Sequence, residues 1–536
     1  MNRTSLSKMS LHAWATSLLW PSPAIRTNGL RLGNMAYALR SVVRANVRIL
    51  VIMVLAVTVR LFWLQDIPYR VDGDAARLGL DGAYVLQNRL PLLGTGWSGY
   101  TNLSLYVYGL FIQATGDEIL GVRLFSALGG SLGVAAVYLL ARQLLGERVG
   151  LFSAFFLSVL PFHLVFSRSG LDLVWPILFA ALGLYLLPAH ALLAGAVVGL
   201  AQYFYHAAKL VPILVLFYCV IRRMPLRQIL CLAVGFLLVF GPMLCYYVQH
   251  PDTFFTRINE VSVFQTGGFS GWSDALERLA RNFLVFLFPV QGSLLYFVYT
   301  PYLEIVARVL FAAGLVIGMA RIKQWPYQLL LFWFAAGVVL GGVFTAKSPL
   351  PNRFTILLPP VVILMGRGLE GLGKLTERKL RASLHAILLI AVLGLYAITS
   401  LGSYWLHDTR DIYRQDLNTQ IATVAGRYLM ERQDEYHVYF LGEIKPDPRF
   451  SLGYESIPTL RFLTGRTGTD IWGSVKDALP FVDNSVLIVL PGRETELGEL
   501  IGLCPGASVS RFRSQSGTLL FSMVENCAPA PAKTAE

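Results

Sequence analysis

The segment from position 69 to 84 contains acidic residues that could take part in catalysis. This stretch reads YRVDGDAARLGLDGAY and holds three carboxylates within ten residues, at Asp72, Asp74 and Asp81. An ionised carboxylate can take a proton from a hydroxyl group as a general base. A purely structural interpretation is also open, because Asp72 could cap a helix, Asp74 would suit its first turn, and Asp81 could pair with Arg77.

A set of basic side chains stands near the ends of apolar runs. Its members are Arg123, Arg168, His206, Lys209, Arg257, Lys347 and Arg353. Each of them alone could simply extend from the membrane to the lipid headgroups. As a set they indicate an anion site at a membrane interface, because Arg and Lys are the usual partners of phosphate. We expect Arg123, Arg168, His206, Lys209, Lys347 and Arg353 to bind the phosphate of a lipid donor.

The acidic and basic sets together suggest one reaction. A carboxylate would deprotonate an acceptor hydroxyl, while the cations would stabilise a departing phosphate. If that phosphate is attached to a lipid, the membrane itself delivers the leaving group. The activated lipid would then supply the energy, and no nucleotide would be needed.

The composition of the chain indicates where these residues must be positioned. Of the 536 residues, 55% are hydrophobic and 14% are charged, whereas about a quarter of an ordinary soluble domain is charged. Apolar runs of about 17–25 residues, the length that crosses a bilayer as a helix, recur over most of the first 400 positions. The net charge of +13 could attract nucleic acid, but the basic residues cluster between apolar runs, as the positive-inside rule predicts. We therefore expect a polytopic α-helical membrane protein with no nucleic-acid partner.

The apolar runs predict about eleven spans. They cover residues 47 to 64, 119 to 141, 149 to 167, 173 to 187, 190 to 206, 209 to 221, 228 to 248, 302 to 320, 326 to 345, 354 to 369 and 383 to 402. Threading them in alternation gathers most basic clusters on the side of the N-terminus, which we expect to be cytoplasmic. Those clusters are Arg142 with Arg148, Arg222 with Arg223 and Arg227, Arg321 with Lys323, and Lys374 with Arg378, Lys379 and Arg381.

This threading divides the chain into three parts. Residues 1–46 form a basic cytoplasmic extension, 47–402 a transmembrane domain and 403–536 an extracytoplasmic domain, in a cell inner (plasma) membrane. The loop 65–118, which carries Asp72 and Asp74, then lies outside the cytoplasm. Within it, Ala75, Leu78, Gly79, Gly82, Ala83 and Leu86 follow helical spacing. This stripe predicts an amphipathic helix along the membrane surface.

The C-terminal part has the pattern of a small α/β domain. A helical pattern covers residues 412 to 432, and YHVYFLG and SVLIVLP are typical of strands. The final PAPAKTAE is expected to be disordered. Cys504 and Cys527 are the cysteines outside the apolar runs. Because the threading places them in an oxidising compartment, we predict a disulfide between them.

Four segments in this order resemble a known family. They are DGDAARLGLDGAYVL, GVRLFSALGGSLGVAAVYLLARQLLG, SVLPFHLVFSRSG and QYFYHAAKLVPIL. They resemble integral-membrane glycosyltransferases of the protein O-mannosyltransferase and aminoarabinose (lipid A) transferase type, which have the GT-C fold. The resemblance extends from about residue 47 to 370 and is strongest over 60 to 212.

The resemblance implies roles for several residues. Asp74 matches the first acid of an acidic pair in the first outer loop, which activates the acceptor. Ala75 and Ala76 follow where the family usually has Glu-Ala, so Asp72 would have to substitute, and a divalent metal at Asp72 and Asp74 is possible. Arg123, Arg168, Lys209 and Arg353 match basic positions of the family. The implied donor is a polyprenyl-phosphate sugar, and the implied acceptor is an unidentified hydroxyl on a protein, lipid or glycan.

Two other classes of function stay open. Polar residues near helix ends also mark substrate paths in transporters and flippases. Against a transporter, no internal repeat links the two halves, and a carrier would not need the long outer loop and the large tail. The missing second acid also leaves room for a catalytically silent member of the family. Sugar release from a lipid donor would separate the three classes.

Overall fold

The structure is a computed structural model that consists of two units, residues 1–51 and 52–536. It describes residues 32–265, 268, 271–289, 301–408, 417–432, 434–443, 453–454, 457–478, 481–482, 484–514 and 517–527. Most of the predicted N-terminal extension and the whole PAPAKTAE end lie outside this part. Helix α2 (Leu32–Leu61) begins within the predicted extension and continues through its expected boundary at residue 46.

Each of the eleven expected spans lies on a helix or on a pair of helices. The helices are α2, α5 (Glu118–Leu145), α6 (Glu147–Val159) with α7 (Pro161–Arg168), α8 (Trp175–Leu186), α9 (Ala191–Ala201), α10 (Leu210–Ile221), α11 (Leu226–Gln249), α14 (Ile305–Ala320), α15 (Trp325–Val338), α17 (Leu358–Glu377) and α18 (Ala382–Gly402). Among the described residues, five helices are long and apolar enough to cross a membrane, or six if α6 and α7 form one bent span. The helices α8, α9, α10 and α14 are shorter, so the expected count of about eleven is not confirmed.

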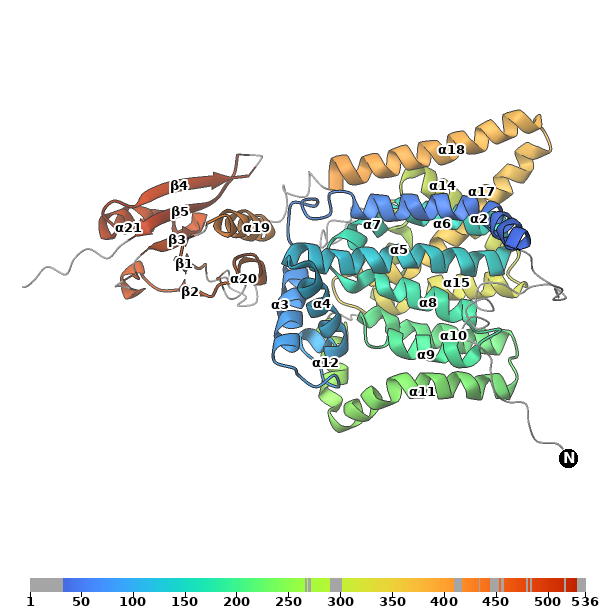
Figure 1. The fold of residues 1–536 in the computed structure, drawn as a ribbon, viewed down its shortest axis with the longest axis horizontal. Coiled ribbons are helices and arrows are strands. Elements are labelled where there is room, and N and C mark those ends of the chain that lie inside the picture. Colours follow the sequence, from blue (N-terminus) through green and yellow to red (C-terminus); the bar gives the residue numbers. More distant parts are fainter. Residues whose placement is uncertain are drawn as a thin grey trace, which may run out of the picture. The chain divides into compact units, whose positions relative to one another are not determined.

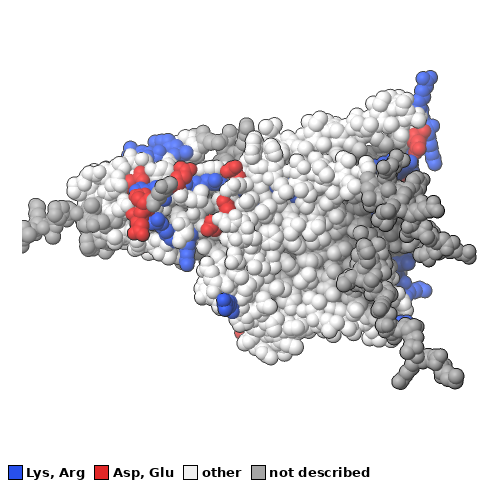
Figure 2. Space-filling model, viewed as in Figure 1, with Lys and Arg blue, Asp and Glu red and all other residues white. Residues whose placement is uncertain are grey.

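The surface of the bundle exposes many apolar side chains, as a surface that faces lipid does. Only 11% of the most apolar stretch of Ala382–Leu406, which contains α18, is buried. In Pro351–Glu377, which contains α17, the corresponding fraction is 83%. α17 therefore lies in the core of the bundle and α18 at its periphery. Helices α5, α8, α9 and α11 follow one another side by side (Figure 1), and in the same view the central surface of the bundle shows almost no charged side chains (Figure 2). Apolar side chains exposed over such a band are what a bilayer requires.

The loop 65–118 folds into two helices joined by a short turn. They are α3 (Gly73–Gln87) and α4 (Asn102–Thr115), with η1 (Trp97–Gly99) between them. α3 packs closely on α4, because a Cβ built on Gly82 would lie 2.8 Å from the Leu105 carbonyl oxygen. The predicted helix is therefore present, but its apolar stripe contacts protein. Gly82 faces α4, and Gly79 faces Phe462 of the tail.

The segment between α11 and α14 carries two further helices among its described residues, α12 (Pro251–Val261) and α13 (Trp272–Leu284). The short turns that matter for the site are η2 (Asp172–Val174), η3 (His206–Lys209), η5 (Val339–Val343), α16 (Pro351–Phe354) and η6 (Thr355–Leu357). Each of these short segments lies beside the end of an apolar helix. η3 carries His206 and Lys209, and α16 carries Arg353.

The tail forms a five-stranded sheet in the order β2-β1-β3-β5-β4. Its strands are β1 (His437–Leu441), β2 (Gly468–Ile471), β3 (Ser485–Val489), β4 (Ser508–Arg513) and β5 (Leu519–Cys527). β1 pairs in parallel with β2 and β3, whereas β5 is antiparallel to β3 and β4. The predicted strands in YHVYFLG and SVLIVLP are β1 and β3.

Helices cover both faces of this sheet. On one face Phe440 and Ile488 pack with residues of α19 (Leu417–Met430) and α20 (Pro458–Thr464). On the other face Leu441 and Leu487 pack with residues of α21 (Leu497–Leu503). All five residues of β3 are buried, as is typical of a strand between two layers. This explains why SVLIV is a continuous apolar run.

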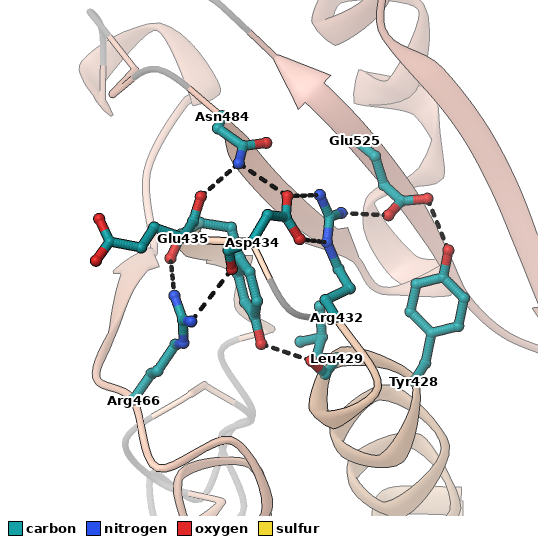
Figure 3. Close-up of polar contacts among 9 residues, drawn as sticks. Tyr428, Leu429, Arg432, Asp434, Glu435, Arg466, Asn484 and Glu525 are labelled. Atoms are coloured by element: carbon teal, nitrogen blue, oxygen red, sulfur yellow. Dashed lines mark hydrogen bonds and ion pairs between the residues drawn. The ribbon is translucent and has the colours of Figure 1, made fainter.

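Polar contacts around Arg432 connect the end of α19 to the sheet (Figure 3), and a disulfide connects α21 to β5. Arg432 contacts Asp434 at 2.6 Å and Glu525 of β5 at 2.5 Å. Arg432 and the Asn484 amide together hold the pKa of the Asp434 carboxyl below its ordinary value. Cys504, just after α21, is joined to Cys527 by a disulfide with a Cα–Cα distance of 4.9 Å. The side of the membrane on which the tail lies stays a prediction.

Candidate active site

The two acids at the start of α3 have different surroundings. Asp72 is the N-cap residue, with extended backbone angles, and its Oδ1 accepts a hydrogen bond of 2.9 Å from the Asp74 backbone N–H. This is the structural role that the sequence left open for Asp72. Asp74, in the first turn, lines a narrow cleft. The two carboxylates are therefore not equivalent.

Six parts of the chain meet around the Asp74 cleft. Its lining consists of Asp74, Trp97, Ser98, Tyr100, Leu171, Leu173, Tyr205, His206, Arg257 and Asn352. The cleft has a volume of about 20 Å³, which is room for about one water molecule. A sugar therefore cannot be enclosed in the cleft as it stands, and any larger group has to enter from a neighbouring space.

A larger, mainly apolar cavity of about 450 Å³ lies next to this cleft. The two share Tyr205, His206 and Arg257 as lining residues. Apolar side chains from α10, α12 and the α15–η5 helix form its walls, and four basic residues line it, namely His206, Lys209, Arg257 and Arg353. Its volume is in the range of small-molecule sites. An apolar cavity with cations on its lining suits an amphipathic anion.

The basic side chains of the cavity are held by local contacts. Lys209 Nζ lies 4.4 Å from the centroid of the Phe254 ring and 3.5 Å from the Phe254 carbonyl oxygen. Arg353 Nη1 donates to the Ala346 carbonyl at 2.7 Å. These contacts hold the charged ends of the two side chains beside the cavity, so less conformational entropy is lost when an anion binds.

A polar cluster, which we call the Ser98 clasp, connects the turn η1 beside Asp74 to α12. Its members are Ser98, His206, Arg257 and Glu260. Ser98 Oγ donates to Glu260 Oε2 at 2.7 Å, and Arg257 Nη1 contacts the same carboxylate oxygen at 2.9 Å. The His206 ring nitrogen Nε2 lies 3.0 Å from the Ser98 carbonyl oxygen. The Ser98 clasp therefore links η1 to η3 and α12 at the point where the cleft and the cavity meet.

Two of the predicted phosphate ligands have another task in the structure. Arg123 is buried, and its guanidinium donates to the carbonyls of Leu64, Gln65, Pro68 and Arg70 at 2.7–2.9 Å. Arg168 is also buried and donates to the carbonyls of Val59, Arg60, Phe62 and Ile67 at 2.7–2.9 Å. Neither side chain lines the cleft or the cavity. Both guanidiniums instead bind the backbone that leads to α3, and phosphate binding by Arg123 and Arg168 stays an untested prediction.

Of the four remaining predicted phosphate ligands, three line the cavity and one does not. His206, Lys209 and Arg353 line the cavity, together with Arg257. Lys347 is exposed and has a left-handed backbone (φ 56°). It is not among the residues that line the cleft or the cavity. The structure therefore brings together three of the six residues predicted to bind phosphate.

Sequence reasoning missed two buried polar residues beside the cleft. Asp172 in η2 is fully buried, and Tyr100 Oη donates to its Oδ1 at 3.3 Å, while Oδ2 has no partner among the described residues. Asn352, which lines the cleft, donates to Tyr205 Oη at 3.2 Å. A signal for Asp172 existed, since it is a lone acid between two apolar helices in SRSGLDLVW. Asn352 gave none.

Asp81, the third acid of the stretch, pairs with Arg77 at 3.1 Å, as predicted. Burial raises the pKa of the Asp81 carboxyl, although the neighbouring Arg77 opposes this shift. In the part of the chain that the structure describes, no three His, Cys, Asp or Glu side chains are grouped as metal ligands would be. Metal binding by Asp72 and Asp74 stays an untested expectation.

The comparisons with known proteins agree with this architecture. The family model described as dolichyl-phosphate-mannose-protein mannosyltransferase matches residues 102–246. The crystal structure of ArnT from Cupriavidus metallidurans bound to undecaprenyl phosphate is similar at 16% identity and a TM-score of 0.57, over 92% of this chain and 99% of that one. Its apo state has a TM-score of 0.56 at 16% identity, over 91% of this chain and 100% of that one.

A second fold relative is the Archaeoglobus fulgidus oligosaccharyltransferase tethered to an acceptor peptide. It is 12% identical, with a TM-score of 0.51, over 89% of this chain and 74% of that one. Among curated proteins, none matches the sequence. Identities this low establish the fold and not the substrate. The chain is therefore a multi-pass membrane protein with the GT-C fold of integral-membrane glycosyltransferases, as its sequence predicted.

Proposed function

We propose that the protein transfers a sugar from a polyprenyl-phosphate donor to an acceptor hydroxyl on the extracytoplasmic face of the membrane, with Asp74 as the general base. One observation carries the proposal. The cleft that holds Asp74 and the apolar cavity lined by cations share Tyr205, His206 and Arg257. A base and a site for a lipid phosphate are thus adjacent.

The chemistry assigns a role to each part. The acceptor hydroxyl gives its proton to the Asp74 carboxylate, and its oxygen bonds to the anomeric carbon of the sugar. The bond from that carbon to the phosphate oxygen breaks, and the lipid phosphate leaves with the electron pair. The phosphate gains negative charge in this step, which the charges of Lys209, Arg257 and Arg353 are placed to stabilise, with the buried His206 beside them.

One fold relative supports the same donor class, because it was solved with undecaprenyl phosphate. Another was solved with an acceptor peptide. In this chain the apolar walls of the 450 Å³ cavity suit the first isoprene units of such a lipid. The cleft is too small for the sugar, so the sugar would enter from the cavity side.

Purified protein in nanodiscs should be incubated with a panel of undecaprenyl-phosphate and dolichyl-phosphate sugars, with and without a chelator. We expect one donor class to release lipid phosphate, detected by mass spectrometry. The chelator arm decides whether a divalent metal is required. Translocation of intact donor without release of lipid phosphate would instead indicate a flippase. No release from any donor would contradict the proposal.

A further inference from the structure

The five residues that lead into α3 have all their backbone carbonyls bound by side chains. Arg168 binds the carbonyl of Ile67, and Arg123 binds those of Pro68 and Arg70, each at 2.7–2.9 Å. The two remaining carbonyls, those of Tyr69 and Val71, are bound by residues of the tail. Arg427 Nε donates to Tyr69 at 3.0 Å, and Thr459 Oγ1 donates to Val71 at 3.3 Å.

Two further contacts connect the tail to this segment. The Val71 backbone N–H donates to Thr423 Oγ1 of α19 at 3.1 Å, so Thr423 and Thr459 together hold both polar groups of one residue. The Arg427 guanidinium also lies 4.6 Å from the centroid of the Tyr69 ring. Val71 stands directly before the N-cap Asp72 and three residues before Asp74. The tail therefore fixes the backbone at the entry to the helix that carries the proposed base.

The tail also contacts α3 along its length. Helix α20 packs against α3, and the Phe462 ring lies over Gly79, where an added Cβ would come within 2.3 Å of Phe462 Cε2. Thr423, Thr459 and Phe462 are at most 3% exposed. Hydrogen bonds shielded from water in this way are strong and directional. The contact is therefore a close-packed, dry interface.

We propose that the tail domain positions α3, with Thr423, Arg427, Thr459 and Phe462 as the positioning residues that aim Asp74 at the reacting hydroxyl. This inference rests on the proposed function of Asp74. A displacement of about 1 Å at a catalytic group can cost about a hundredfold in rate. Loss of these contacts should therefore lower kcat while the donor site, which is formed by other elements, keeps its affinity.

The first test removes the hydroxyl contacts without changing the shape of the side chains. In full-length protein in nanodiscs, the double variant Thr423→Val/Thr459→Val loses both bonds to Val71. Thr464→Val is the matched control, because in the described bonds this α20 hydroxyl contacts only residues of the tail, namely Leu460, Tyr454 and Arg466. We expect kcat to fall at least tenfold in the double variant, with unchanged affinity for undecaprenyl phosphate, and to stay near wild type in the control.

Hydrogen–deuterium exchange gives a readout that does not depend on activity. We expect faster exchange in residues 67–81 of the double variant and no change there in Thr464→Val. If the wild type transfers no sugar, the proposed function has failed, and exchange alone then tests the contact. Unchanged exchange, or faster exchange with wild-type kcat, would overturn the positioning role and leave the tail a stabilising cap.

The second test uses the close approach at Gly79. Gly79→Ala should push Phe462 away and lower kcat, although alanine is the better helix former. Phe462→Leu removes the Cε and Cζ atoms that the new methyl group would meet. The pair Gly79→Ala/Phe462→Leu should therefore recover most of the lost kcat. A Gly79→Ala variant with wild-type kcat, or a loss that Phe462→Leu does not relieve, would contradict the inference.

Discussion

Asp72 and Asp74 stand two residues apart, yet the first caps α3 and the second faces the cleft. We predict that Asp72→Asn keeps both stability and activity, since Asn caps a helix as well as Asp does. Asp72→Ala should lose about 0.5–2 kcal/mol of stability, the usual value of a cap. Thermal unfolding and turnover of the two variants check this. An Asn variant that unfolds normally but has lost turnover would show that the Asp72 carboxylate itself takes part in the chemistry.

The buried arginines and the cavity cations should respond differently to substitution. In Arg123→Lys and Arg168→Lys one ammonium replaces a guanidinium that holds four carbonyls, so we expect a lower unfolding temperature with donor affinity retained. In Lys209→Gln and Arg353→Gln we expect about a tenfold or greater loss of affinity for undecaprenyl phosphate, because a bond to a charged group contributes about 1.5–3 kcal/mol. Unfolding curves and lipid-phosphate binding measure the two effects. The opposite pattern would support Arg123 and Arg168 as phosphate ligands.

The sequence could place basic residues at helix ends but could not show where their side chains point. Arg123 and Lys209 both stand near such ends, yet one binds loop carbonyls and the other lines the cavity. The difference depends on the path of residues 64–71, which no local pattern encodes. Asn352 likewise gains its meaning only from Tyr205 and the cleft, which lie far from it in the sequence.

At the scale of elements, the pairing of α3 with α4 depends on two glycines. A Cβ on Gly109 would lie 2.4 Å from the Gly82 carbonyl oxygen, a backbone atom that cannot move aside cheaply. We predict that Gly109→Ala destabilises the protein, because overpacking costs about 1–3 kcal/mol. Gly394→Ala in α18 is the control, since an added Cβ there meets nothing within 4 Å. Equal unfolding temperatures for the two variants would rule out this close packing.

Continuous apolar patterns predicted most elements of the bundle and two buried strands of the tail. Elements without such a pattern were missed. β4, SVSRFR, is an edge strand with no fully buried residue, so it lacks the apolar run that identified β3. α4, NLSLYVYGLFIQAT, was also missed although it is apolar, because its 14 residues are fewer than a membrane span needs and it lies within the predicted loop. The buried stripe of α3 was assigned to a membrane surface, whereas part of it packs on α4. Such partners are set by tertiary contacts.

At the scale of the whole molecule, the disulfide ties the end of the described chain to the tail domain. Cys504 and Cys527 are 23 positions apart, and a loop of that size contributes about 3 kcal/mol in the chain-entropy model. We predict that Cys504→Ser/Cys527→Ser lowers the unfolding temperature of the tail, whereas Cys245→Ser, an exposed free thiol, does not. Mass spectrometry of unreduced protein should find the two residues linked. Free thiols at both positions in protein purified without reductant would contradict this and weaken the extracytoplasmic assignment.

The proposed reaction needs a base in the loop 65–118 and a donor site that is formed by other elements. Single-turnover sugar transfer by Asp74→Asn, with the donor that the panel identifies, tests this separation most directly. We predict a loss of about a hundredfold or more in rate, the usual contribution of a positioned base, with unchanged affinity for the lipid phosphate and an unchanged unfolding temperature. Wild-type transfer by the Asn variant would contradict the assignment of Asp74 as the general base.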